Sequence, residues 1–315
     1  MTVLLEVIDS LAPLVVLVVI GAALLRFGFF DEAFRHGLDR LVYWVCMPAL
    51  LLGKLAESGR PDAAMALTAL SISLITVLLF ALGIGAWWLL GKPKGALGVI
   101  AQASGRGNIA YVGLPVIQLS SDSHEAIAIT AVAMVPTILL FNLIAVPLLI
   151  AAAERDKTKA SPMRMLRSIG TNPLILACVL GLALALLGLK LPKPADDTLT
   201  LLGMPASPIA LISVGGSMLA FHARAHLVPA LAVAAVKLGI GLGLGVLCVL
   251  AFRLDHDETL ALLVMAACPT AVTSVVLVGQ IGGDRGLAAS CVGVTTALSV
   301  FSLGGALAIA HLWQG

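Results

Sequence analysis

The chain has 315 residues, of which 60% are hydrophobic and only 11% are charged, and its formal net charge at pH 7 is +2. A soluble domain is usually about 45–50% apolar and about 25% charged, so this composition excludes a soluble enzyme. The small net charge gives no reason to expect nucleic acid as a partner. Long apolar runs without two-residue alternation predict an all-α integral membrane protein, because a backbone in hydrocarbon must satisfy its own hydrogen bonds.

Ten apolar segments are long enough to be membrane-spanning helices. We predict them at residues 11–29, 38–55, 64–90, 95–119, 125–152, 171–189, 198–220, 227–252, 258–280 and 286–312. The first segment follows Glu6 and Asp9 and lacks the basic start of a cleaved signal peptide, so we expect it to remain as a span.

Two patterns recur at about half the chain length. A proline followed by glycines at spacings of 8 and 7 occurs at residues 13–28 and again at residues 173–188, at an offset of 160. An aspartate followed by a Met-Pro-Ala triplet occurs at residues 39–49 and again at residues 197–206, at offsets of 158 and 157. Recurrence at nearly constant offset predicts an internal duplication.

The duplication divides the chain into a first five-helix repeat (residues 1–153), a basic cytoplasmic linker (residues 154–170) and a second five-helix repeat (residues 171–315). Because five is an odd number of spans, the second repeat must enter the membrane with opposite topology. Inverted repeats of this kind are typical of secondary transporters.

Lysine and arginine are distributed unequally between the two ends of the predicted spans. One face collects twelve of them and the other collects five, while Arg106 and Lys237 lie within spans. The positive-inside rule places the twelve-cation face in the cytoplasm, with both termini on the outer face of the cell (inner) membrane.

The fourth and ninth predicted spans contain interruptions in matching positions. Gly107 and Gly113 weaken the fourth span, and Pro115 cannot donate a helical hydrogen bond, so we expect its second half to begin near Pro115. Pro269 interrupts the ninth span. The structural alternative is a simple proline kink in each span, but matching interruptions in both repeats are typical of a transport site. The two broken helices run in opposite directions and should meet near the midplane of the bilayer.

Polar side chains near these interruptions are candidates for binding a substrate. They are Arg106, Asn108, Asn142, Thr270, Thr273, Ser274 and Lys237. A half-helix that begins at the midplane presents unpaired N–H groups and the positive end of its dipole, which favours an anion. A cation at membrane depth is costly and should face a cavity or a partner.

Structural alternatives exist for three of these side chains. Arg106 could lie in a cytoplasmic vestibule, Lys237 could be a structural donor, and Asn142 could join two helices by a hydrogen bond. No aspartate or glutamate lies deep in a span, and no cluster of side chains has the spacing of a metal site or of a catalytic set. We therefore expect no enzyme activity, no metal and no cofactor. Freed backbone carbonyls leave room for a coupling ion, with sodium and proton both open.

Residues 108–115, Asn-Ile-Ala-Tyr-Val-Gly-Leu-Pro, resemble the N-x-x-aromatic-x-GLP motif of the auxin efflux carrier family, whose bacterial members are described as malonate or other organic-acid permeases. Residues 39–50 are similar to the family's second-span pattern, which ends in Pro-Ala-Leu, and Lys237, residues 268–271 and Gly-Gly-Asp284 also resemble family positions. The chain departs from the family after Lys237, where Leu-Gly-Ile-Gly-Leu-Gly replaces a frequent proline.

This resemblance implies a fold shared with bile-acid sodium symporters. Spans 1, 2, 6 and 7 would form a scaffold, and the remaining spans would form a mobile unit in which the broken spans 4 and 9 cross. The substrate would bind near the crossing and be moved by an elevator-type alternating access.

The predicted function is secondary active transport of a small organic anion, a carboxylate such as malonate or an auxin-like acid. One alternative is sodium-coupled symport of a bile-acid-like amphipathic anion, and another is a membrane ligand sensor that does not transport. The expected partners are the organic anion and the lipid bilayer, and a homodimer is left open.

Overall fold

The computed structural model describes residues 2–57, 62–121, 123–152, 170–219, 226–281 and 283–313. Its first half contains α1 (Thr2–Arg26), α2 (Glu32–Leu41), α3 (Met47–Glu57), α4 (Ala63–Leu89), α5 (Leu97–Gly105), α6 (Leu114–Ser120) and α7 (His124–Ala152). Its second half contains α9 (Pro173–Leu187), α10 (Lys193–Gly203), α11 (Ala206–Leu219), α12 (Leu227–Ala234), α13 (Gly241–Phe252), α14 (His256–Ala267), α15 (Thr273–Ile281) and α16 (Arg285–Leu312). The predicted linker lies outside the described residues except for Gly170.

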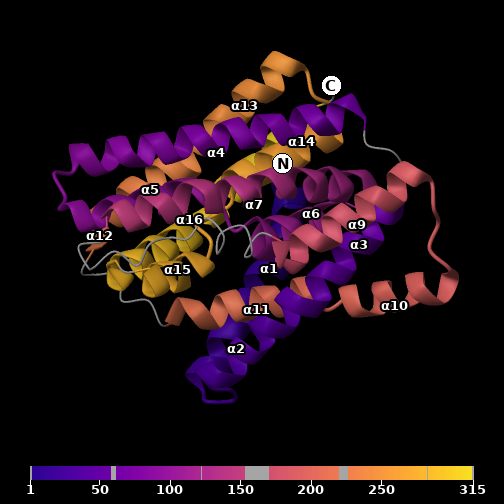
Figure 1. Cartoon of the computed structure of the whole chain (residues 1–315), viewed down its shortest axis with the longest axis horizontal. Helices are drawn as coiled ribbons and strands as arrows, with labels where there is room; N and C mark the ends of the chain where they lie inside the picture. Colours follow the sequence, from indigo (N-terminus) through magenta and orange to yellow (C-terminus); the bar gives the residue numbers. More distant parts are fainter. Residues whose placement is uncertain are drawn as a thin grey trace.

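Short turns of other helix types join some of these elements. Three π-helical turns, η1 (Val42–Cys46), η3 (Ile109–Gly113) and η5 (Ala235–Ile240), connect α2 to α3, lead into α6 and connect α12 to α13. A 3₁₀ turn, η2 (Lys94–Ala96), precedes α5. Figure 1 shows the resulting bundle, in which α4, α5 and α7 lie side by side.

The regular structure of the described residues is helical throughout, with one isolated bridge pairing. Five helical stretches are long and apolar enough to cross a membrane: Ala63–Leu89, His124–Ala152, Lys193–Met218, Leu227–Phe252 and Arg285–Leu312. Shorter apolar helices cover Leu11–Arg26, Ile109–Ser120 and Pro173–Leu187. The prediction of an all-α membrane protein is thus confirmed, whereas ten spans in two inverted repeats stay a prediction.

Two predicted spans begin earlier than the apolar pattern indicated. The second begins at Glu32 because the carboxylate of Asp31 caps the helix, accepting a hydrogen bond from the N–H of Phe34 at 2.7 Å. The seventh begins at Lys193 and is divided into α10 and α11 by a turn at Met204 and Pro205. Caps and turns depend on single residues, which a hydropathy window averages away.

Pro48 and Pro115 lie inside helical backbone and do not interrupt it. Each follows a π-helical turn, in which the N–H of Met47 bonds to the carbonyl of Val42 and the N–H of Leu114 bonds to the carbonyl of Ile109. These bonds reach back five residues, and the wider turn leaves room for a ring that lacks an N–H. The expectation that the second half of the fourth span begins near Pro115 is therefore wrong: helical backbone already resumes at Ile109.

The glycines of the recurring sequence pattern have the same roles in both halves. An added Cβ on Gly21 of α1 would lie 1.9 Å from the carbonyl oxygen of Ile212 in α11, and one on Gly181 of α9 would lie 2.8 Å from Cβ of Leu55 in α3. Gly28 and Gly188 follow α1 and α9 with φ of +71° and +65°, which non-glycine residues rarely adopt. Small residues thus let α1 approach α11 and α9 approach α3.

The centre of the bundle is α14. Every residue from Glu258 to Ala267 is buried, and α14 contacts α4, α7, α13 and α16. The last turn of α14 therefore ends inside protein, where its freed carbonyls need protein partners.

We predict that Gly21→Ala lowers the free energy of unfolding by about 1–3 kcal/mol, because the new methyl group would collide with rigid backbone. Gly85→Ala is the matched control, since nothing lies within 4 Å of its added Cβ. The two variants can be compared by thermal unfolding of purified protein in detergent. Equal unfolding temperatures for Gly21→Ala and the unmodified chain would contradict the close packing of α1 on α11.

Candidate functional site

The two interruptions meet and satisfy each other's backbone. The segment after α5 and the segment after α14 form an antiparallel bridge between Gly107 and Thr270. The N–H of Asn108 donates to the carbonyl of Pro269 at 2.8 Å, and the N–H of Ala271 donates to the carbonyl of Arg106 at 3.0 Å. These four groups have no partner within their own helices, so the pairing removes the cost of exposing them at membrane depth.

Thr270 connects the paired segments to the helices α5 and α16 by hydrogen bonds. Its hydroxyl donates to the carbonyl of Ala103 in α5 at 2.7 Å, and its N–H donates to the hydroxyl of Thr295 in α16 at 3.1 Å. Thr270 is fully buried and does not line a cavity with the other candidates. Its observed contacts are with protein groups, and a direct contact of Thr270 with a substrate stays a prediction.

Other side chains satisfy backbone groups near the interruptions. The hydroxyl of Ser302 in α16 donates to the carbonyl of Ala267, the last residue of α14, at 2.9 Å. The amide of Gln102 donates to the carbonyl of Ser274 at 3.3 Å. Thr270 and Ser302 thus occupy carbonyls near the ends of both first halves, which the sequence left open for a coupling ion, whereas the Gln102 contact reaches the second half of the ninth span.

A cavity of about 320 Å³ adjoins the crossing on one side. Four of the predicted site residues line it: Arg106, Asn108, Asn142 and Thr273. The residues that begin both second halves, Asn108–Tyr111 and Ala271 with Thr273, also line it. The positive ends of two half-helix dipoles therefore face the same space.

Two nitrogen donors of this cavity are buried without a protein partner in the described part of the chain. They are Nη1 of Arg106 and Nδ2 of Asn108. Arg106 makes no ion pair with a described carboxylate, and no described aspartate or glutamate lines the cavity. A guanidinium and an amide that share a space without acids can both donate hydrogen bonds to an anion.

Asn142 offers the cavity a hydrogen-bond acceptor, in contrast to the donors of Arg106 and Asn108. Its Nδ2 donates to the carbonyl of Ile138 one turn earlier at 3.0 Å, which leaves the amide oxygen as its polar contribution to the cavity. The alternative role, a hydrogen bond between two helices, is not seen because both partners belong to α7.

Lys237 and Ser274 lie close to the crossing but outside the cavity lining. Lys237, in η5, is 3% exposed, and its ammonium would lie 3.2 Å from a Cβ added to Gly107. Ser274, in α15, is 1% exposed and its hydroxyl has no partner within the described residues. Lys237 makes no ion pair with any carboxylate that the structure describes. It adds positive charge behind the crossing and does not touch the cavity.

The four predicted helix-breaking residues have different positions. Gly107 lies in the first interruption and Pro269 in the second. Gly113 lies in η3, where its missing Cβ lets the backbone approach Sγ of Cys268, and Pro115 lies at the start of α6. The fourth span is therefore interrupted at residues 106–108, because there the opposite segment supplies hydrogen-bond partners.

Sequence reasoning missed three polar residues of the cavity: Tyr43, Tyr111 and Asn172. Asn172 was assigned no role, although its side chain caps α9 by accepting from the N–H groups of Leu174 and Ile175. Tyr111 is the aromatic residue of the motif at residues 108–115, which was the one signal that pointed to it.

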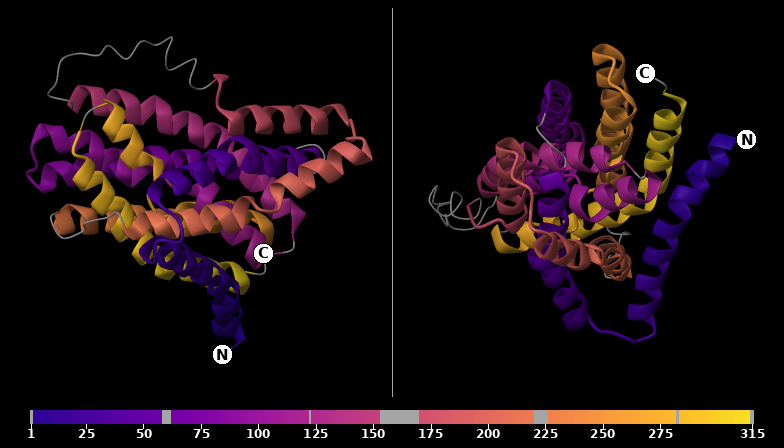
Figure 2. Two further views of the ribbon diagram at one scale, coloured as in Figure 1. Left: turned by 90° about the horizontal axis from the view of Figure 1, so that it is seen from below. Right: turned by 90° about the vertical axis from the view of Figure 1, so that its right-hand side faces the viewer.

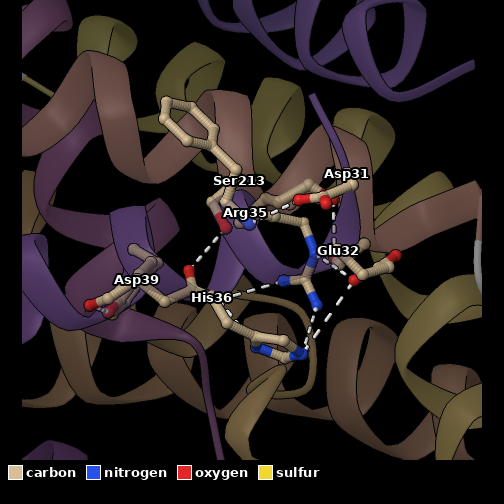
Figure 3. A network of polar contacts seen from close by, with 10 residues as sticks. Asp31, Glu32, Arg35, His36, Asp39 and Ser213 are labelled. Carbon is tan, nitrogen blue, oxygen red and sulfur yellow. Dashed lines mark hydrogen bonds and ion pairs between the residues drawn. The ribbon is translucent and has the colours of Figure 1, made fainter. Parts of the chain in front are cut away.

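Tyr111 also joins the cavity to a polar network on α2 (Figure 3). Its hydroxyl donates to the backbone carbonyl of Asp39 at 3.2 Å. The carboxylate of Asp39 accepts from Nη1 of Arg35 at 2.9 Å and from the hydroxyl of Ser213 in α11, and Arg35 also bonds to Glu32 at 2.8 Å. Arg35 is one of the twelve cations on the face that the sequence predicts to be cytoplasmic, and the structure shows it buried and paired with these two carboxylates.

The fold and the site place the chain among proteins that move solutes across membranes, and comparison with known proteins agrees. Residues 6–306 match the family described as "Membrane transport protein". The chain therefore belongs to this family, that of the auxin efflux carriers, as the motif at residues 108–115 indicated. It is a multi-pass membrane transport protein and not an enzyme.

Three curated relatives are similar to part of the chain. They are called "Uncharacterized transporter YfdV" and come from Escherichia coli strain K12, Escherichia coli O157:H7 and Shigella flexneri. Each is 26% identical over 215 residues, which is 66% of this chain and 67% of the relative.

We predict that Thr270→Val destabilises the fold, because it removes the hydrogen bond to Ala103 and leaves that carbonyl unpaired. The expected loss is about 1–3 kcal/mol of unfolding free energy. Thr273→Val, at an exposed position on the cavity, is the matched control and should leave the unfolding temperature unchanged. Equal thermal stability of both variants in detergent would show that Thr270 does not hold the crossing together.

Proposed function

We propose that the protein is a secondary transporter of a small organic anion, which binds at the crossing of the two broken helices. The observation that carries this proposal is the pair of buried, unpartnered donors, Nη1 of Arg106 and Nδ2 of Asn108, in one cavity. Leaving such donors unpaired is costly, and a carboxylate can accept from both.

The walls of the cavity favour a carboxylate with an apolar body. Apolar residues of the lining, Met134, Ile138, Phe141, Leu174 and Leu277, can pack against an apolar body, and the further polar side chains of the lining, Tyr43, Tyr111, Asn142, Asn172 and Thr273, are uncharged. Arg106 is the single cationic side chain among the described residues that line the cavity. An auxin-like monocarboxylate therefore suits the cavity better than malonate, whose second carboxylate would need the more distant Lys237.

The packing supports the proposed pair of inverted repeats. Helix α1 packs on α11 and α9 packs on α3, and these two contacts between the proposed repeats are equivalent if α1 corresponds to α9 and α3 to α11. In this arrangement α1, α2, α3, α9, α10 and α11 form the scaffold, and the remaining helices form the unit that an elevator mechanism moves.

The proposed motion requires contacts between the two units that can break. Tyr111 meets Asp39, Gln118 meets Ser207, and Lys54 meets His124 at 3.0 Å. Each is a single hydrogen bond between a scaffold helix and the unit with the crossing, which is the kind of contact that an alternating-access transporter can exchange.

We place the protein in the cell (inner) membrane with both termini outside. In this orientation Tyr43, Asn172 and Leu277 belong to the cytoplasmic ends of their helices, so the cavity faces the cytoplasm. Sodium-coupled symport of a bile-acid-like anion is the second candidate. It is less well supported because Thr270 and Ser302 already occupy carbonyls at both interruptions.

Uptake by proteoliposomes tests the proposed function. We expect saturable uptake of a labelled aromatic monocarboxylate such as indole-3-acetate, and equal rates in sodium and choline buffers. Uptake that requires sodium and a steroid carboxylate would favour the second candidate. Folded protein that binds labelled carboxylates without flux would favour a sensor, and no binding of any mono- or dicarboxylate would refute an anion site.

Variants of the two donors test the site. Arg106→Gln and Asn108→Ala should each weaken binding about 10–100-fold, because each removes a hydrogen bond to a charged group. Lys94→Gln removes an exposed cation remote from the cavity and is the control for net charge. Binding is measured by scintillation proximity on purified protein, with thermal unfolding as the check on folding. Unchanged affinity in both donor variants would place the anion elsewhere.

A further inference from the structure

A second cavity, of about 240 Å³, lies between α1, α6, α11 and α16. Its lining shares no residue with the cavity at the crossing. The floor is formed by Leu14, Val116, Val214 and Leu303, which are 5%, 1%, 2% and 4% exposed. We call this second cavity the aliphatic groove.

The aliphatic groove is open at the outer surface of the bundle. Its rim includes Val15, Val19 and Val300, which are 38%, 59% and 43% exposed. Figure 2 shows α1 at the edge of the bundle, with the N-terminus and the C-terminus of the chain toward the same side. In a membrane transport protein the medium at such an exposed apolar rim is the bilayer.

The groove lies at the depth of lipid tails. Thr296, in its lining, is the twelfth of the 28 residues of α16, close to the middle of a helix that is long enough to cross the bilayer. Headgroups lie outside the hydrocarbon core, so only a chain can reach this depth.

The polar content of the groove excludes water as its regular occupant. A buried water needs two to four polar partners. The hydroxyl of Thr296 is the single unpartnered buried side-chain atom in the described lining, since the hydroxyl of Ser299 donates to the carbonyl of Thr296 at 2.8 Å. Aliphatic walls without a partner lose dispersion contacts, and a hydrocarbon chain restores them.

We propose that the aliphatic groove binds one acyl chain of a bilayer phospholipid. The acyl chain would lie against Val112 and Val116, in the space that α1 and α11 enclose with the second half of the broken helix, and it would contact no residue of the cavity at the crossing. The groove is thus a lipid site between the two units, and its existence does not depend on which solute the protein carries.

Photocrosslinking in vesicles tests this proposal. The full chain is reconstituted in phosphatidylcholine vesicles that contain a phosphatidylcholine with a diazirine in the middle of one acyl chain, and adducts are mapped by mass spectrometry after irradiation. We expect adducts on the buried floor residues Val116 and Leu303 in addition to lipid-exposed residues such as Phe301, which is 78% exposed. Adducts on Phe301 without any on the floor would overturn the proposal.

A variant with a larger side chain in the groove, called the filling variant, distinguishes lipid bound in the groove from lipid that only touches the exposed surface of the bundle. Ala297 lines the groove, so Ala297→Phe should abolish the floor adducts and preserve those on Phe301. Leu298→Phe is the matched control, because Leu298 is a neighbouring exposed residue outside the lining. If Ala297→Phe fails to fold by size-exclusion chromatography, Val300→Phe at the rim replaces it. Floor adducts that persist in the folded filling variant would also refute an acyl chain in the groove.

Discussion

The rest of this molecule depends on the antiparallel pairing of two interrupted helices. Backbone hydrogen bonds from Asn108 to Pro269 and from Ala271 to Arg106 let two segments of the chain leave helical geometry inside the membrane. The N–H and carbonyl groups that the helices no longer satisfy are paired with each other. The pairing fixes where each second half begins, and both half-helix N-termini therefore face one cavity. Hydroxyls from Thr270 and Ser302 complete the arrangement by occupying carbonyls of the first halves. This backbone geometry favours the proposed anion site before any side chain is considered.

The side chains then determine what the site can accept. Arg106 and Asn108 supply donors, and the absence of a described carboxylate from the cavity lining leaves their charge and polarity uncompensated. The rest of the lining combines apolar residues of α7, α9 and α15 with uncharged polar side chains such as Tyr43, Tyr111 and Asn172, which suits the proposed substrate with one anionic group and an apolar body. Lys237 raises the positive potential from behind Gly107 without entering the cavity.

The packing of α1 on α11 and of α9 on α3 shows how a repeated sequence pattern becomes a repeated contact. Gly21 and Gly181 permit close helix approach, and Gly28 and Gly188 end their helices in left-handed backbone. The single hydrogen bonds from Tyr111 to Asp39 and from Gln118 to Ser207 join these helices to the unit with the crossing. The aliphatic groove lies along the same boundary, so lipid and solute would occupy separate cavities that both adjoin η3.

The sequence by itself determined the class of the protein, its helical segments, the family and the matching interruptions, because apolar length, Gly/Pro chemistry and a local motif are properties of neighbouring residues. It also identified Arg106, Asn108, Asn142 and Thr273 as polar residues near the site. Only the tertiary structure decided that Pro115 continues a helix after a π turn, that Thr270 bonds to Ala103, and that Tyr43 and Asn172 line the cavity. The first outcome depends on a backbone hydrogen bond five residues long, and the bond from Thr270 to Ala103 joins residues 167 positions apart. A hydrogen bond between residues so far apart produces no periodic pattern in the sequence. The partner of Thr270 is therefore visible only in the tertiary structure, where the two broken helices meet.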